Sequence, residues 1–188
     1  MSELTDELIA DARERMGKSV EATQGEFGSV RTGRASPALL DRVTVDYYGA
    51  QTPLKQLATI NVPEARMLTI QPFDKSSMKA IEKGIIDAQL GLAPSNDGNI
   101  VRLVIPELTE ERRKDLVKMV RAIAEEGRVA IRNVRRDVMH DLRELRDEGE
   151  VGADDEHRAE VELQKLTDEK IAELDSLLKG KEAEILEV

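Results

Sequence analysis

Cysteine and tryptophan are absent from this 188-residue sequence, and histidine occurs only twice. Without cysteine the chain has no disulfide framework, no thiolate nucleophile and no thiolate metal site. The two histidines, His140 and His157, are too few for a histidine-rich metal site. We therefore expect neither a metal nor another cofactor.

Long hydrophobic runs are also missing. No segment approaches the roughly 18 uninterrupted apolar residues of a membrane span. The acidic start at Met1-Ser2-Glu3 differs from the basic region that opens a targeting sequence. These patterns predict a soluble, cytoplasmic protein with no membrane partner.

Positive charge is scarce overall but unevenly distributed. The chain carries 28 basic and 38 acidic side chains, for a formal net charge of −10. Residues 150–188 hold 5 basic and 13 acidic side chains, whereas residues 107–149 hold 11 of each. Between Gly127 and Arg136 there are four arginines and no acid. A local positive field is therefore compatible with an acidic protein, and the net charge does not exclude nucleic acid as a partner.

Three segments have the apolar spacing of long amphipathic helices. The first begins near Leu8 and ends near Gly33, and the second covers residues 110–148 after Thr109, a predicted N-cap. The third is opened by acidic residues from Asp154, which complement the positive end of a helix dipole. Because each helix has a single apolar stripe, the three must pack on one another. A short glycine-containing turn makes the last helix antiparallel to its predecessor.

The segment between the first two helices follows a different pattern, with frequent proline and glycine and period-two alternation. Ser36 is a predicted N-cap and Pro37 the first helical residue after it. Tyr47 and Tyr48 are expected on opposite faces of a strand, one buried and the other exposed. We predict a small α/β unit with strands at 43–47, 58–62, 67–71 and 100–105, a helix at 77–90 and a turn at 94–99.

The predicted fold is α+β, with an elongated antiparallel three-helix bundle interrupted by the small unit. Residues 1–31 and 107–188 form the bundle domain, and residues 32–106 form the inserted domain. Two single-chain connections then join the domains and are predicted to act as a hinge. The residues assigned to the hinge are Thr32, Gly33, Ile105 and Pro106.

Catalytic motifs are missing. The sequence contains no G-x-G-x-x-G, no G-x-x-x-x-G-K-[ST], no H-E-x-x-H and no G-x-S-x-G. Most carboxylates have Arg or Lys nearby, as on a solvated helix face. The acidic residues at 154–156 are better explained by the helix dipole than by a metal site. We predict no catalytic residue and no enzymatic activity.

The second long helix carries a row of arginines beside its apolar seam. At about 100° per residue, Ile131, Val134, Val138, Leu142 and Leu145 share one direction. The arginines lie about 100° away. We call these residues the arginine ridge: Arg121, Arg128, Arg132, Arg135, Arg136, Arg143 and Arg146. Arginine suits phosphate binding because its planar fork donates two parallel hydrogen bonds.

Two interpretations of the arginine ridge remain open from the residues alone. In one, the ridge binds RNA, because its central arginines have few acids within one turn on their own side. In the other, the arginines pair with Glu125, Asp137 or Asp141, or with the acidic last helix, and the bundle is an adaptor that binds only proteins. Arg31 and Arg34 lie at the domain junction and are further candidates for contact with a partner.

Seven segments, in their order and spacing, strongly resemble the bacterial ribosome recycling factor family. The resemblance covers essentially the whole chain. The segments are RTGRASP at 31–37, YYG at 47–49, PLKQLA at 53–58, SNDG at 95–98, LTEERRK at 108–114, RVAIRNVRRD at 128–137 and KEAEI at 181–185.

The resemblance implies a near-L-shaped protein whose smaller domain is β/α/β. It also implies a function. With elongation factor G and GTP hydrolysis, members of the family split the post-termination ribosome into subunits and release messenger RNA and tRNA. The implied partners are the 70S ribosome, its large subunit and elongation factor G, with the protein itself a monomer.

The resemblance also assigns the binding face. The family's bundle lies on the large subunit across the A and P sites, where arginines matching Arg132 and Arg135 contact ribosomal RNA. We expect the acidic last helix to face away from that RNA. The predicted RNA-binding residues are Arg128, Arg132, Arg135 and Arg136, with Arg31 and Arg34.

Overall fold

The computed structural model describes residues 2–187 and divides the chain into two compact units. One consists of the chain up to Arg31 together with Glu111–Glu187, and the other is Thr32–Glu110. The first is helical, and the second combines a helix with two small antiparallel sheets, which confirms the predicted α+β class. No helix within residues 2–187 combines the length and apolarity needed to cross a bilayer.

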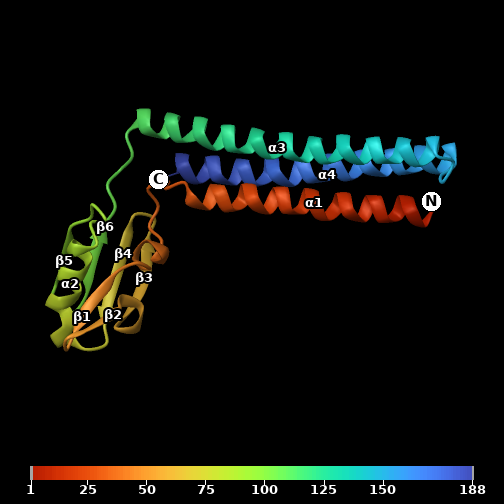
Figure 1. Cartoon of the computed structure of the whole chain (residues 1–188). Coiled ribbons are helices and arrows are strands. Elements are labelled where there is room, and N and C mark those ends of the chain that lie inside the picture. The colour runs from red at the N-terminus through yellow and green to blue at the C-terminus, as the bar shows by residue number, and fades with distance from the viewer. Residues whose placement is uncertain (1, 188) are drawn as a thin grey trace. The chain divides into compact units, whose positions relative to one another are not determined.

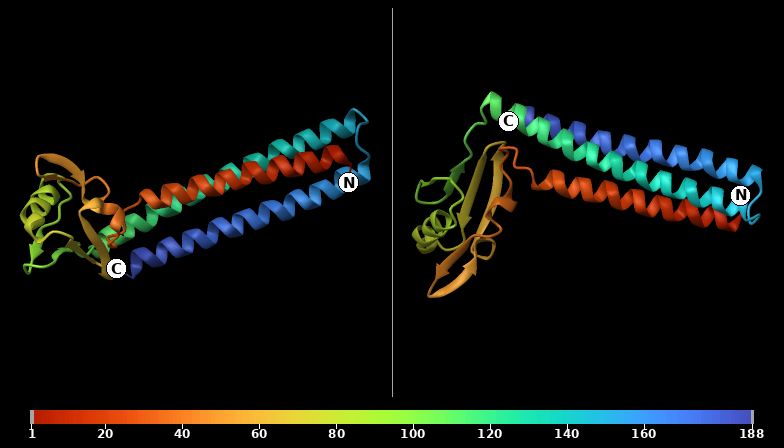
Figure 2. Two further views of the ribbon diagram at one scale, coloured as in Figure 1. Left: turned by 90° about the horizontal axis from the view of Figure 1, so that it is seen from below. Right: turned by 45° about the horizontal axis from the view of Figure 1, so that its top comes forward.

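Three long helices form the bundle, namely α1 (Glu3–Ser29), α3 (Glu110–Asp147) and α4 (Ala153–Leu186). Figures 1 and 2 show them side by side, with α3 running opposite to α1 and α4. The start of α1 therefore lies beside the turn between α3 and α4. These bounds confirm the three predicted helices and the antiparallel turn, and α3 begins directly after Thr109.

The bundle core is built from the apolar stripes that the sequence predicts. Gly127 of α3 is also buried, because α1 and α4 approach it through Thr23 and Leu174. Leu145, predicted on the seam, is only partly buried near the end of α3. The principal core residues are Ile9, Ala12, Met16, Val20 and Phe27 on α1; Leu116, Val120, Ala124, Ile131, Val134, Val138 and Leu142 on α3; and Ala159, Leu163, Leu166, Leu174 and Ile185 on α4.

The turn between α3 and α4 reverses the chain in a few residues. Gly149 has φ +80°, a left-handed conformation that glycine adopts without steric cost. The N–H of Glu150 donates to the carbonyl of Leu145 at 2.9 Å and closes the last turn of α3. Glu156, in the first turn of α4, is buried and accepts two hydrogen bonds from Nη1 of Arg146 at 2.9 and 3.0 Å. This ion pair links the two helices at the turn.

The smaller unit has a four-stranded sheet of order β3-β4-β6-β5 and a separate β1-β2 hairpin, with all pairs antiparallel. One helix, α2 (Met78–Asp87), packs against the hairpin and contributes Ile81 and Ile85 to the core of the unit. The strands are β1 (Thr44–Tyr47), β2 (Ala50–Pro53), β3 (Ala58–Glu64), β4 (Met67–Pro72), β5 (Pro94–Asn96) and β6 (Val101–Val104).

Most local predictions for this unit are confirmed. Ser36 caps the short 3-10 helix that begins at Pro37, and its side chain accepts a hydrogen bond from the N–H of Ala38 at 3.3 Å. Strands β2 and β5 were missed because they are short and largely exposed, so they lack an apolar alternation.

The prediction that Tyr47 and Tyr48 lie on opposite faces of a strand was wrong. Strand β1 ends at Tyr47, and Tyr48 adopts φ +51° in the turn that follows. The two rings consequently meet edge to face with centroids 4.6 Å apart. Tyr48 is exposed and Tyr47 is only partly buried, with its hydroxyl donating to Asp74 at 3.4 Å.

The residues assigned to the hinge differ in how firmly the smaller unit holds them. Thr32 and Ile105 are buried, and the N–H of Ile105 donates to the carbonyl of Arg66 at 2.8 Å. Gly33 has φ +76°, and a Cβ placed there would lie 3.0 Å from Cγ of Leu108. Pro106 is exposed. Ile105 is thus part of the unit's core and not a free connecting residue.

Candidate nucleic-acid interface

The apolar seam of α3 places the arginine ridge at the surface of the bundle. Ile131 and Val138 are fully buried, which turns the neighbouring arginines toward the edge of the helix. Their side chains differ in exposure, from 20% for Arg128 through 48% for Arg132 to 76% for Arg136. Within residues 2–187, no group of three or more His, Asp and Glu side chains is placed to hold a metal ion.

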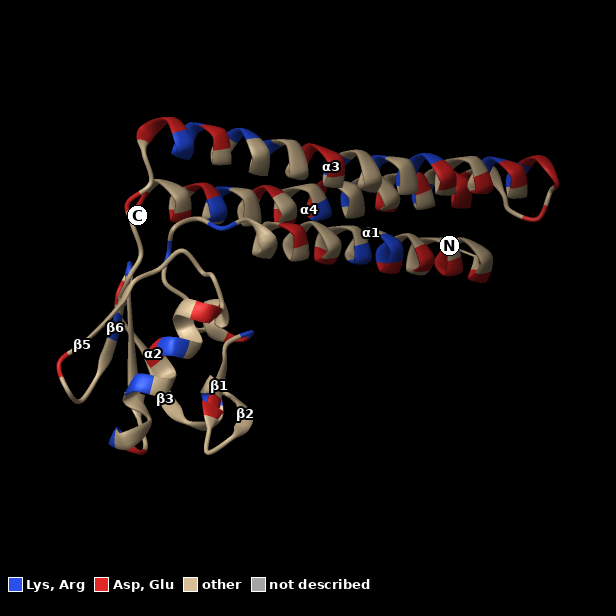
Figure 3. Cartoon of the chain, turned by 60° about the vertical axis from the view of Figure 1, so that its left-hand side comes forward, with Lys and Arg blue, Asp and Glu red and all other residues tan. Residues whose placement is uncertain are grey.

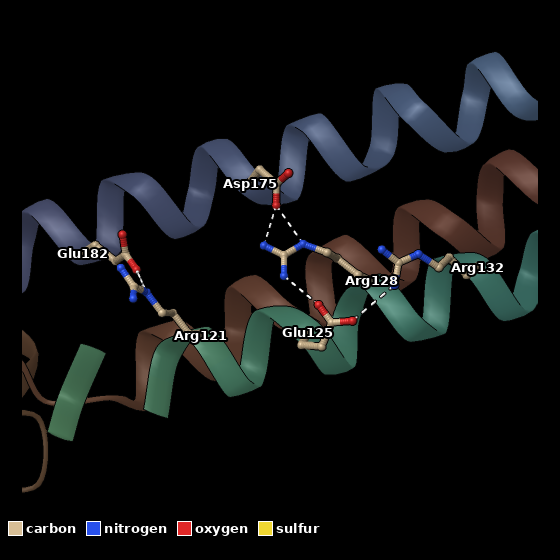
Figure 4. A network of polar contacts seen from close by, with 6 residues as sticks. All are labelled: Arg121, Glu125, Arg128, Arg132, Asp175 and Glu182. Atoms are coloured by element: carbon tan, nitrogen blue, oxygen red, sulfur yellow. Dashed lines mark hydrogen bonds and ion pairs between the residues drawn. The ribbon is translucent and has the colours of Figure 1, made fainter. Parts of the chain in front are cut away.

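Arg128 is held by two carboxylates, as Figure 4 shows. Its Nε and Nη2 donate to Oδ1 of Asp175 on α4 at 2.8 and 2.7 Å, and its Nη1 donates to Oε2 of Glu125 at 2.9 Å. These bonds raise the pKa of Arg128, with the hydrogen bond to Asp175 as the main cause. The few acids expected within one turn of Arg128 do not leave it unpaired, and the ion-pair alternative describes it correctly.

Arg132 is also in contact with Glu125, but more loosely. Its Nη1 donates to Oε1 of Glu125 at 3.2 Å, and nearly half of its side chain remains exposed. The carboxylate of Glu125 thus bridges Arg128 and Arg132 (Figure 4). The hydrogen bond from Arg128, followed by that from Arg132, lowers the pKa of Glu125, which is therefore ionised at neutral pH.

Arg135 and Arg136 have weaker links to acids. Nη1 of Arg135 donates to the side-chain oxygen of Gln164 on α4 at 2.8 Å, a neutral partner that leaves the positive charge uncompensated. Nε of Arg136 lies 4.0 Å from Asp137, the outer limit of an ion pair, and the side chain is highly exposed. On α3, these two arginines and Arg132 are the residues of the predicted site that retain positive charge available to a partner.

The acidic last helix is not set apart from the arginine ridge. Figure 3 shows acidic and basic residues interspersed along the three helices of the bundle. Besides Asp175, two acids of α4 reach α3, since Glu182 accepts from Nε of Arg121 and Glu156 accepts from Arg146. The expectation that the acidic last helix faces away from ribosomal RNA stays a prediction, but these three acids contact arginines of the ridge. Helix α4 packs beside α3, so its flanking side chains meet the ridge.

An open groove between α3 and α4 continues from the ridge. Arg135, Arg136 and Arg143 line it together with His140 and His157, the only histidines of the chain. Sequence reasoning assigned no role to the histidines. The spacing of His140 four residues after Arg136 already placed it on the same helix face. The lining also includes Asp137, Asp141 and Glu160, so the groove carries charges of both signs and adds Arg143 and the two histidines to the predicted residues.

Arg31 and Arg34 are exposed but belong to different units, the first ending the helical unit and the second lying in Thr32–Glu110. The structure brings Arg128, Arg132 and Arg135 onto one side of α3. Arg31 and Arg34 are not part of that helix.

The fold and this face define a class of protein: a two-unit binding protein whose long helical bundle carries arginines suited to phosphate. A family model described as ribosome recycling factor matches residues 23–186, which cover the smaller unit completely and most of the helical unit. The chain belongs to the ribosome recycling factor family. This confirms the resemblance drawn from the seven sequence segments.

Full-length relatives have the same description. A ribosome-recycling factor of Rubrobacter xylanophilus is 56% identical over 188 residues, with 100% of each chain covered. One from Bacillus subtilis is 54% identical over 185 residues, covering 98% of this chain and 100% of the relative.

Solved structures are similar as well. A solution structure of the ribosome recycling factor matches with a TM-score of 0.73 and 42% identity, with both chains covered completely. A second match has a TM-score of 0.62 and 52% identity, covering 97% of this chain and 98% of the other. This second structure comprises models for the Thermus thermophilus ribosome recycling factor and the Escherichia coli elongation factor G bound to the Escherichia coli post-termination complex.

Proposed function

We propose that this protein recycles ribosomes after termination. With elongation factor G and GTP, it separates the post-termination ribosome into subunits in the cytoplasm, so that messenger RNA and tRNA leave. It is a translation factor and not an enzyme. The observation that carries this proposal is the similarity to ribosome recycling factors along the entire chain, at 56% identity to one of them.

The bundle binds ribosomal RNA of the large subunit through Arg132, Arg135 and Arg136. Their guanidinium groups lie beside a rigid apolar seam, and none of the three is enclosed by carboxylates as Arg128 is. Contacts to phosphate oxygens position a protein on RNA without reading base sequence. Such contacts suit a factor that must bind every ribosome irrespective of the message it carries.

The energy for splitting comes from the partner. Elongation factor G hydrolyses GTP and pushes the smaller unit, and the bundle acts as a wedge between subunits. The two connections transmit the push as a hinge. Because Thr32 is buried and Ile105 is anchored in the smaller unit, the bending falls on Gly33 and the chain from Pro106 onward.

Light scattering of purified post-termination ribosomes tests the proposal. We expect the wild-type protein to split them only when elongation factor G and GTP are both present. Arg132→Glu with Arg135→Glu should reduce affinity for the large subunit at least about tenfold and make its salt dependence shallower by about two phosphate contacts.

A matched variant controls for total charge. Arg158→Glu with Lys165→Glu makes the same change in charge at two exposed residues, which line a different groove next to Arg13 of α1. It should split ribosomes as the wild type does. Equal ribosome binding by the wild type and the Arg132/Arg135 variant would instead favour the adaptor, and turnover without ribosomes would indicate an enzyme.

A further inference from the structure

The carboxylate of Glu125 is the one acid that contacts two neighbouring arginines of the ridge within residues 2–187. We propose that Glu125 is a positioning and specificity-determining residue. It orients Arg132 for a phosphate fixed in folded ribosomal RNA, and it weakens the binding of Arg132 to flexible single-stranded RNA. This inference rests on the proposed function, because it concerns how the same face discriminates between RNAs.

Arg128 holds Glu125 in place. Two donors of Arg128 are used by Asp175 on the adjacent helix, and the third, Nη1, donates to Glu125. With 20% of its side chain exposed, Arg128 is the least exposed of the ridge arginines that form ion pairs. Arg128 therefore connects Glu125 to α4 through its ion pairs, and its own charge is largely neutralised by the two carboxylates.

Glu125 in turn orients Arg132 from one end of the guanidinium. Within residues 2–187, Arg132 donates a single hydrogen bond, from Nη1, which leaves the edge formed by Nε and Nη2 without a protein partner. That edge is one of those with which arginine grips a phosphate through two parallel bonds. Because the side chain is already ordered, binding at this edge costs less conformational entropy.

The same carboxylate weakens the attraction for RNA that arrives without a defined orientation. A flexible single strand meets the negative charge of Glu125 together with the positive charge of Arg132, and the two fields partly cancel. A phosphate fixed in a folded RNA can instead engage the Nε–Nη2 edge on the side away from Glu125. The face therefore distinguishes folded RNA from a flexible single strand by the direction from which the phosphate approaches Arg132.

Glu125→Gln tests the proposal, and Glu126→Gln is the matched control. Glu126 is exposed at the next position of α3, and its substitution makes the same change in net charge. We expect Glu125→Gln to strengthen binding to a labelled oligouridine of about 20 nucleotides roughly threefold, as for the loss of one exposed ion pair. It should weaken binding to purified large subunits about threefold, because Arg132 must then be ordered on binding. Glu126→Gln should change the ratio of the two affinities less than twofold.

The double variant with Arg132→Gln shows whether Glu125 acts through Arg132. In that background, Glu125→Gln should alter neither affinity more than Glu126→Gln does. Equal effects of the two glutamate variants, or a full Glu125 effect without Arg132, would overturn the inference. Failure of Arg132→Gln alone to weaken large-subunit binding would overturn the proposed function instead, and unchanged circular dichroism establishes that the variants are folded.

Discussion

Replacing Gly127 by alanine should destabilise the bundle although alanine favours helix. A methyl group at this position would lie 2.7 Å from Cδ1 of Leu174 and would also collide with Oγ1 of Thr23. Carbon atoms in contact are normally about 3.5 Å apart, so the first contact is too short by roughly 0.8 Å. Neither neighbour moves easily, because Leu174 is fully buried and Oγ1 of Thr23 donates to the carbonyl of Ser19 at 2.9 Å.

Two opposing contributions determine the size of the effect. Overpacking of this kind costs about 1–3 kcal/mol, and two simultaneous clashes place Gly127→Ala at the upper end. Alanine recovers about 1 kcal/mol of helix propensity relative to glycine. The net loss in free energy of unfolding is therefore about 2 kcal/mol, which corresponds to a fall in melting temperature of about 4–8 °C for a chain of this size.

Thermal and urea denaturation followed by far-UV circular dichroism measures this loss, and Gly180→Ala is the control. Gly180 lies inside α4, and a Cβ added there meets no atom within 4 Å. That substitution should stabilise the protein by about 1 kcal/mol. Stabilisation by Gly127→Ala equal to that by Gly180→Ala would refute the close approach of the three helices.

Two further predictions concern the ends of the two units. Glu156→Gln should lower the free energy of unfolding of the bundle by about 1 kcal/mol, because it removes the carboxylate that accepts both hydrogen bonds from Arg146. Urea denaturation measures this loss. An unchanged free energy of unfolding would mean that water replaces the ion pair at no cost. In the smaller unit, backbone N–H groups of the 97–100 turn lower the pKa of Asp97. The contribution of Asp97 to stability is present above the ordinary carboxyl pKa and is lost as the pH falls through the lowered folded value. An NMR titration of this carboxyl should give a pKa below that of an unstructured Asp, and a value at or above it would contradict the turn geometry.

The long helices could be predicted from sequence because their information is local. Each signal belongs to a single helix and its ends. These signals are the apolar spacing, Thr109 directly before α3 and the acids at the start of α4. The position of the arginines beside the seam follows from the same periodicity. The two missed strands are short and exposed. The orientation of Tyr48 depended on the residue at which β1 ends, and alternation alone does not indicate that residue.

The partners of the arginines could be predicted only in part. Glu125 lies three residues before Arg128, so this ion pair was visible as an alternative in the sequence. Asp175 lies 47 positions away from Arg128, and their contact depends on how far α4 is shifted along α3. That shift is set by packing around buried positions such as Gly127, which the periodicity of a single helix does not contain.

The order of the elements along the chain has a consequence during synthesis. Helix α1 leaves the ribosome first, but its apolar stripe finds its partners only on α3 and α4, after the whole of Thr32–Glu110 has been translated. At about 5–20 residues per second, this delay lasts several seconds at least. The smaller unit can complete its own core in that interval, whereas Met16 and Phe27 stay exposed to solvent until α3 and α4 have been translated.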